Sequence, residues 1–147
     1  MNQPPQASSL AERLMRLGDE LGSREAEHAL GLKSARSRLE ELREEIARAL
    51  AQFQRAATQA GAPQLRAEIS EIRTDDKHVR ALEFEITRGR HAAIVTAKSR
   101  GELTLVGPFR RGKTEGPCLT FPLDAVAEIE QALGDFLERF LREAATP

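Results

Sequence analysis

The sequence predicts an α+β protein: a long N-terminal helix, an antiparallel β-meander of four to five strands, and a C-terminal amphipathic helix. Three observations support this fold class. Apolar residues recur at helical spacing up to Phe53, they alternate with polar residues from residue 64 onward, and helical spacing returns after Asp124. The length of 147 residues suits one small domain with a helical extension.

The N-terminal segment opens with a clear helix start. Residues 1–8 are polar and contain two prolines, so we expect a disordered tail. Ser9 and Glu12 then form a Ser-x-x-Glu capping box, which places the start of the helix at about Leu10. Leucines follow at alternating spacings of four and three, in a stretch weakened by glycines: Leu10, Leu14, Leu17 and Leu21.

A sharper heptad pattern occupies the second half of this helical segment, which spans residues 9–62 and ends at Gly61 and Pro63. The apolar positions of this pattern are Leu32, Ala35, Leu39, Leu42, Ile46, Ala49 and Phe53. Such a stripe pairs with another helix, either in an intermolecular coiled coil or in a helical hairpin bent between Gly22 and Gly31. Alternatively, it packs on the chain's own sheet. We favour self-association into a dimer or higher homo-oligomer, with Leu32, Leu39, Leu42, Ile46 and Phe53 as the oligomerisation residues.

Residues 63–147 form the second unit, the β-meander with its closing helix. Apolar and polar residues alternate in short runs separated by turn signals, and this pattern predicts antiparallel strands with short connections. The single cysteine, Cys118, should begin a buried strand and be inert. After Asp124, one apolar face at helical spacing predicts a helix that covers one side of the sheet.

Basic charge is concentrated in the sheet region. Residues 86–114 carry seven basic side chains and one acidic side chain, Glu102. Successive turns of a meander alternate between its two ends, so the turn at 88–90 and the loop at 107–117 should lie at the same end. The cations expected at that end are Arg88, Arg90, Arg110, Arg111 and Lys113, whereas Lys98 and Arg100 are expected at the opposite end. These seven residues and Phe109 are our candidate nucleic-acid-binding set.

Residues 107–114, Gly-Pro-Phe-Arg-Arg-Gly-Lys-Thr, match the phosphate-binding pattern G-x-x-x-x-G-K-[ST]. That loop works only between a strand and a helix, because the helix N-terminus completes the phosphate cradle. Gly116 and Pro117 predict a turn where the helix should start. Because the motif match is complete but its context is unfavourable, nucleotide-phosphate binding at 107–114 is a second alternative and not the first hypothesis.

Three stretches carry a family resemblance: 82–90 (LEFEITRGR), the Gly112-Lys113 turn before 119–123 (LTFPL), and 132–140 (ALGDFLERF). The layout of residues 65–141 resembles the transcriptional positive cofactor 4 family and the purine-rich-element-binding (Pur-alpha-like) repeat. The resemblance implies a curved four-stranded meander with one helix, usually dimeric, that binds single-stranded nucleic acid through basic residues and stacked aromatics. Here Phe109 is the one aromatic residue expected to serve as a stacking platform, so binding should depend mainly on phosphate contacts and on salt.

Our first hypothesis is a non-enzymatic, cytoplasmic, oligomeric protein that grips single-stranded DNA or RNA with its basic turns. The alternative is a coiled-coil adaptor that docks a protein partner through the N-terminal helix and binds no nucleic acid. We expect no cofactor and no metal site, because the histidines lack partners at ligand spacing and the chain has one cysteine. We expect no membrane association, because no secretory signal or long apolar stretch is visible.

Overall fold

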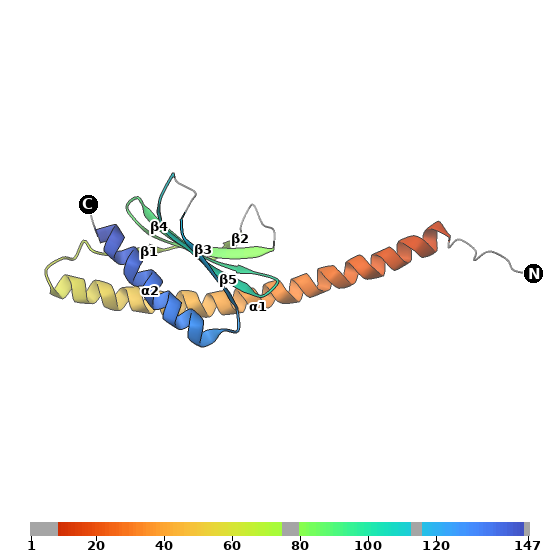
Figure 1. Ribbon diagram of the computed structural model, residues 1–147, viewed down its shortest axis with the longest axis horizontal. Helices are drawn as coiled ribbons and strands as arrows, with labels where there is room; N and C mark the ends of the chain where they lie inside the picture. The colour runs from red at the N-terminus through yellow and green to blue at the C-terminus, as the bar shows by residue number, and fades with distance from the viewer. Residues whose placement is uncertain (1–8, 75–79, 113–115, 146–147) are drawn as a thin grey trace, which may run out of the picture.

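The computed structural model describes residues 9–74, 80–112 and 116–145, so the expected disordered tail lies outside the described residues. Its elements in chain order are α1 (Leu10–Gln59), β1 (Glu68–Ile69), β2 (Arg73–Thr74), β3 (Ala81–Arg88), β4 (His91–Lys98), β5 (Glu102–Arg110), β6 (Cys118–Pro122) and α2 (Val126–Ala145) (Figure 1). The α+β fold with a long first helix, an antiparallel sheet and a closing helix is confirmed.

The sheet is a meander in the order β3, β4, β5, β6, with every neighbouring pair antiparallel. Two short strands, β1 and β2, pair side by side with the outer edge of β3 and bring the total to six strands. The sequence predicts four to five strands and does not show that β1 and β2 are two separate strands. A two-residue strand carries too little alternation to be recognised in a sequence.

The first helix is one continuous rod of 50 residues, so the alternative of a helical hairpin is wrong. Ser9 caps its start, since the side-chain hydroxyl accepts a hydrogen bond from the backbone N–H of Glu12 at 3.1 Å. Gly61 ends it with a positive φ of 98°, and the N–H of Ala62 donates back to the carbonyl of Ala57 at 2.8 Å. Both boundaries agree with the capping signals in the sequence.

Both helices pack on the same face of the sheet, as Figure 1 shows. The core between them and the strands is built from alternate residues of β3, β4 and β5, such as Phe84, Val95 and Leu105. Helix α2 contributes Ile129 and Phe140, which are fully buried. The other face of the sheet has no helix upon it within the described part of the chain.

The heptad stripe of α1 covers the chain's own sheet, which corrects our assignment of these residues to oligomerisation. Leu39, Leu42 and Ile46 are buried in the core, and Leu32 and Phe53 are half-buried against it or at its end. The physical reason is that the apolar face of β3 and β4 needs a cover, and the adjacent helix supplies it at no cost in association entropy.

The N-terminal half of α1 projects beyond the sheet into solvent (Figure 1). Side chains from Leu10 to Glu27 are exposed without exception. Glu25 forms an ion pair with Arg80, just before β3, and close packing begins at Gly31, where an added Cβ atom would clash with the backbone oxygen of Ser99 in the β4–β5 turn. Gly31 therefore marks where close packing of the helix on the sheet begins.

Strand β6 forms the free edge of the sheet, and its residues are mostly exposed. Cys118 lies there as an exposed free thiol, so the expectation that it is buried is wrong. The reason is that β6 has no outer neighbour and lies beyond the reach of the helices for most of its length. In the described residues, neither α1 nor α2 has an apolar stretch long enough to cross a lipid bilayer.

Candidate interaction surfaces

The two basic turns do lie at the same end of the sheet, as the meander topology predicts. His91 pairs with Arg110 in the β4–β5 ladder, and the N–H of Arg111 donates to the carbonyl of Arg90 at 2.8 Å. The fifth cation expected there, Lys113, lies outside the described residues. This group of Arg88, Arg90, Arg110 and Arg111 is called the basic end below.

Arg88 has a structural role at this end. Its guanidinium donates to the carbonyls of Ala144 at 3.2 Å, Gln64 at 2.7 Å and Arg66 at 3.3 Å. These acceptors belong to the end of α2 and to the segment that follows α1. Arg88 thus ties the β3–β4 turn to both helical regions, and its charge lies against the C-terminal turn of α2, where cations are favourable.

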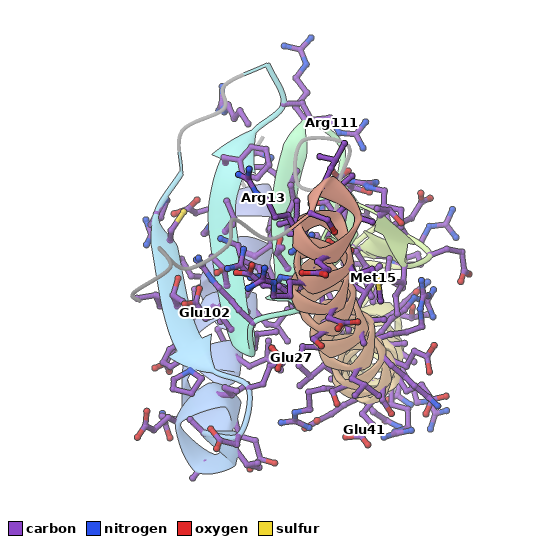
Figure 2. All side chains as sticks on the ribbon, turned by 90° about the vertical axis from the view of Figure 1, so that its right-hand side faces the viewer. Arg13, Met15, Glu27, Glu41, Glu102 and Arg111 are labelled. Carbon is purple, nitrogen blue, oxygen red and sulfur yellow. The ribbon has the colours of Figure 1, made fainter. Side chains whose placement is uncertain are left out.

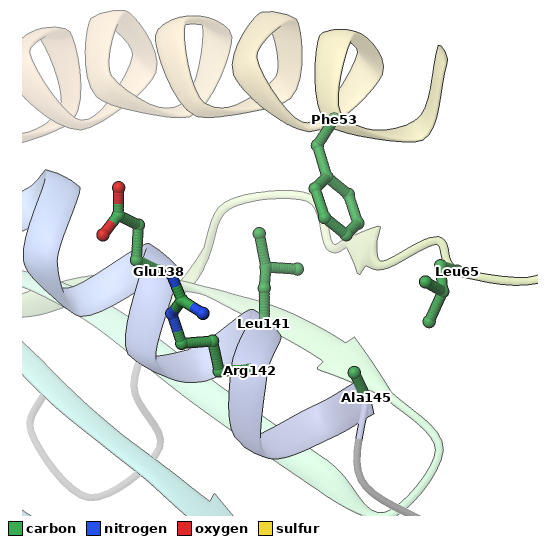
Figure 3. A pocket seen from close by; sticks show the side chains of 6 residues that line it. All are labelled: Phe53, Leu65, Glu138, Leu141, Arg142 and Ala145. Atoms are coloured by element: carbon green, nitrogen blue, oxygen red, sulfur yellow. The ribbon is translucent and has the colours of Figure 1, made fainter. Parts of the chain in front are cut away.

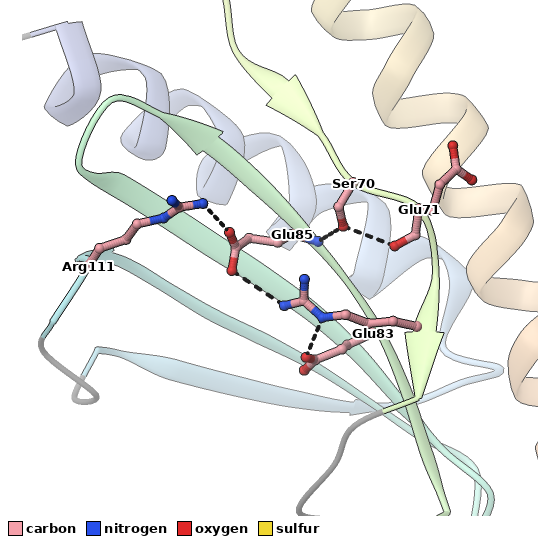
Figure 4. Close-up of polar contacts among 6 residues, drawn as sticks. Ser70, Glu71, Glu83, Glu85 and Arg111 are labelled. Atoms are coloured by element: carbon pink, nitrogen blue, oxygen red, sulfur yellow. Dashed lines mark hydrogen bonds and ion pairs between the residues drawn. The ribbon is translucent and has the colours of Figure 1, made fainter.

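Arg111 is also engaged, through an ion-pair network on the open face of the sheet (Figure 4). Its guanidinium bonds Glu85 at 2.8 Å, and Arg73 joins both Glu83 at 3.0 Å and Glu85 at 3.4 Å. Burial alone lowers the pKa of Arg73, but the hydrogen bonds and charges of the two glutamates outweigh it and raise the pKa. Two carboxylates therefore occupy the face that a nucleic-acid sheet would leave basic.

Arg90 and Arg110 remain available. Both side chains are exposed, and their guanidinium groups make no hydrogen bond or ion pair within the described part of the chain. Beside them is a polar pocket of about 300 Å³. It is lined by Gln64, Arg66, Glu68, Thr87, Arg88, Gly89 and Arg111. The basic end thus offers two free cations and a partly neutralised pocket.

The remaining candidates of the nucleic-acid set are apart from this end. Lys98 and Arg100 lie at the opposite end, as expected, where Lys98 pairs with Glu102 in the ladder and Arg100 bonds the Glu102 carboxylate at 2.9 Å. Phe109 is half-buried, and Gly116 packs so closely that a Cβ there would be 3.2 Å from the Cβ of Phe109. The ring of Phe109 is therefore only partly accessible to a stacking base.

The described residues of the 107–114 motif are not part of a strand–loop–helix unit. Gly107 to Arg110 belong to β5, and the next described elements are strand β6 and, from Val126, helix α2. No helix begins at the end of the described part of this segment, so its backbone N–H groups have no helix N-terminus behind them. The described part of the motif belongs instead to an antiparallel pair of strands, β5 and β6.

The projecting half of α1 presents a second surface, the leucine stripe of Leu10, Leu14, Leu17 and Leu21. Their exposed fractions are 72%, 56%, 44% and 46%. Positions 18 residues apart point the same way, since 18 residues make about five helical turns. Leu17 and Leu21 therefore point in the directions of Ala35 and Leu39, so the stripe continues the face that packs on the sheet.

An apolar pocket of about 330 Å³ opens between the far end of α1 and the end of α2 (Figure 3). Phe53, Leu65, Leu141 and Ala145 form its apolar walls, and charged Glu138 and Arg142 also line it. Nothing in the described chain fills it. In residues 9–74, 80–112 and 116–145, no three histidine, cysteine or carboxylate side chains lie together as metal ligands do.

Comparison of the chain with protein-family models, with curated proteins and with solved structures finds no match. Functional proposals for this protein therefore depend on its own geometry. The leucine stripe is not among the site residues that the sequence predicts. Its spacing of four, three and four is visible in the sequence, but Gly18 interrupts it, and the heptad pattern from Leu32 to Phe53 is more regular.

Proposed function

We propose that this protein is a non-catalytic interaction module that docks a protein partner through the leucine stripe of its projecting helix. The observation that carries the proposal is the exposure of four leucines on one face of a helix with no support of its own. Exposed leucines at a and d spacing cost free energy in water and gain it on contact with another apolar face.

The contrast with the rest of the surface supports this choice. The basic end has lost Arg88 and Arg111 to intramolecular partners, and the open face holds Glu83 and Glu85. The leucine stripe has no such competing partner among the described residues. The sheet with α2 then serves as the folded body that holds the helix in place.

The test is affinity capture with the tagged full chain and a double variant, Leu14→Asp with Leu21→Asp. A matched control replaces exposed apolar residues off the stripe, Met15→Asp with Leu30→Asp, which are 70% and 68% exposed. We expect one or more proteins, a second copy included, to be captured by the wild type and the control and lost by the stripe variant. Identical captured proteins from all three would overturn the proposal.

A second candidate function is polyanion binding at the basic end, and it is favoured by one observation. Arg90 and Arg110 lie on adjacent turns with free guanidinium groups, beside the pocket that holds Arg66. Such a pair can contact neighbouring phosphates of a nucleic acid, with an affinity that falls as salt rises.

Fluorescence anisotropy with single-stranded DNA, double-stranded DNA and RNA at two salt concentrations tests this candidate. The double variant Arg90→Glu with Arg110→Glu should weaken binding by about tenfold or more, while Arg100→Glu at the opposite end should change it little. Equal losses in both variants, or no binding at low salt, would dismiss it.

A further inference from the structure

The projecting half of α1 is poorly equipped to be helical alone. The side chains of residues 10–24 are all exposed, and glycines at 18 and 22 each cost about 1 kcal/mol relative to alanine in a helix. Isolated helices of this length are marginal in water. A partner that buries the leucine stripe would supply the missing stabilisation, and the charges beside the stripe indicate which partner fits.

A parallel, in-register pairing of two copies is blocked by the sheet. The leucine stripe and the buried residues Ala35 and Leu39 point the same way, so a parallel partner helix would run along the face that the sheet already covers. The backbone of Ser99 touches α1 at Gly31, and from Ala35 onward the same face is buried on the sheet, leaving no room for a second helix. Each copy would also need space for its own sheet between two helices about 10 Å apart.

An antiparallel pairing has no such conflict. When Leu10 faces Leu21 of a second copy and Leu14 faces Leu17 of a second copy, the overlap covers the stripe alone. The two sheets then lie beyond opposite ends of the paired segment, as the separation of the stripe from the sheet in Figure 1 allows. All eight leucines are buried in four layers.

The flanking charges favour the same arrangement. Arg13 and Glu20 are seven residues apart, share one flank of the stripe and are both exposed. One carboxylate oxygen of Glu20 accepts from Arg24 of its own helix at 2.8 Å, which leaves the other oxygen for a second cation. Figure 2, which looks along α1 from its N-terminal end, shows Arg13 on the side of the helix nearer the strands and Met15 on the other side. Antiparallel pairing brings Arg13 beside Glu20 of the second copy, twice by symmetry.

We propose that two copies of this chain dimerise through an antiparallel coiled coil of residues 10–21, with reciprocal Arg13–Glu20 ion pairs beside the leucine layers. The inference deepens the function proposed above, since it names a second copy as the partner. Small residues on the other flank, Ala11 and Gly18, face each other across the pair and allow the helices to approach closely.

The contact is short, so the dimer should be weak. The leucine layers span about 16 Å of helix at 1.5 Å per residue. Such a contact buries far less than the roughly 1,600 Å² of a standard stable interface. We therefore expect monomers and dimers in exchange, with dimers disappearing on dilution.

Sedimentation equilibrium of the purified full chain over a range of concentrations tests the dimer. Leu14→Asp should raise the dissociation constant by at least about tenfold, whereas Met15→Asp should leave it unchanged within about twofold. Arg13→Glu and Glu20→Arg should each weaken the dimer, and the double exchange should restore it. A monomer at every concentration would overturn the inference, and so would a failure of the double exchange to restore association.

Disulfide trapping tests the direction in a Cys118→Ser background. In the antiparallel pair, chains carrying Leu10→Cys and chains carrying Leu21→Cys should cross-link only when mixed. Each variant alone places its thiols about 16 Å apart, beyond the reach of a disulfide. A parallel pair gives the opposite result, with each variant linking to itself, and would overturn the proposed direction.

The two proposals fail in distinguishable ways. If the purified chain stays monomeric while the capture experiment still yields a foreign protein that depends on Leu14 and Leu21, the antiparallel dimer is wrong and the interaction module stands. If neither experiment depends on these leucines, both are wrong.

Discussion

The two halves of α1 carry similar apolar stripes and put them to different uses. From Leu32 to Leu50 the stripe lies on the sheet, whereas from Leu10 to Leu21 it faces solvent. Spacing and residue type hardly differ between the halves, and the same face of one continuous helix serves both. What differs is the presence of a second apolar surface opposite, so a stripe indicates that something must cover it and leaves the identity of the cover open.

The strongest way to break this comparison is to truncate equivalent leucines in the two halves. Leu39 and Leu21 are 18 residues apart and point the same way, but Leu39 is fully buried and Leu21 is 46% exposed. Leu39→Ala should lower the free energy of unfolding by about 2–5 kcal/mol, because it leaves a cavity in the core. Leu21→Ala should change it by less than about 0.5 kcal/mol. Chemical denaturation at low protein concentration measures both, and similar losses would show that the projecting half is supported within the monomer.

Two glycines sharpen the comparison with effects of opposite sign. Gly31→Ala places a Cβ in conflict with the backbone oxygen of Ser99, so the helix and the turn must separate at a cost of about 1–3 kcal/mol. Gly18→Ala meets no atom within 4 Å and should increase helix stability by up to about 1 kcal/mol. Thermal melts followed by circular dichroism should show a lower midpoint for the first variant and equal or greater helicity for the second. A higher midpoint for Gly31→Ala would contradict the prediction, because it would show that the turn at Ser99 moves away from the helix at little cost.

The smallest expected difference in unfolding free energy is between two arginines of one turn. Arg88 is hydrogen-bonded to other segments, whereas Arg90 is exposed. Arg88→Ala leaves three carbonyl acceptors without their donor and should cost about 1–2 kcal/mol. Arg90→Ala removes an exposed guanidinium and should cost less than about 0.5 kcal/mol. Urea denaturation midpoints of the two variants make the comparison. Equal midpoints would show that the three hydrogen bonds of Arg88 contribute nothing measurable to stability.

Much of the fold could be predicted because the signals are local. The hydroxyl of Ser9 and the positive φ of Gly61 act within a few residues of their own positions, so the helix boundaries are readable from the sequence. The meander could be predicted because one face of β3 is buried and the other is not. Apolar Leu82 and Phe84 therefore alternate with the polar residue Glu83 between them.

The rest depends on contacts between distant segments. The sequence places Arg88 among the candidate nucleic-acid-binding residues and gives no sign of its structural role, because its acceptors, the carbonyls of Gln64, Arg66 and Ala144, come from two remote segments. The role of the α1 stripe rested on a small difference in periodicity: the straight helix buries Leu50 where a heptad pattern places Ala49. The glycine at 31 suggested a bend, although it serves a close approach by Ser99 that no local pattern reveals.

The length of α1 has a consequence for how this protein behaves in solution. A rod of 50 residues is about 75 Å long at 1.5 Å per residue, and part of it extends clear of a small body. Friction with the solvent grows with this elongation, so the 16.3 kDa chain should diffuse slowly and leave a gel-filtration column early, like a larger sphere. Its apparent size on such a column reflects its shape as much as its mass, and removing residues 1–24 should reduce that size more than the lost mass alone accounts for.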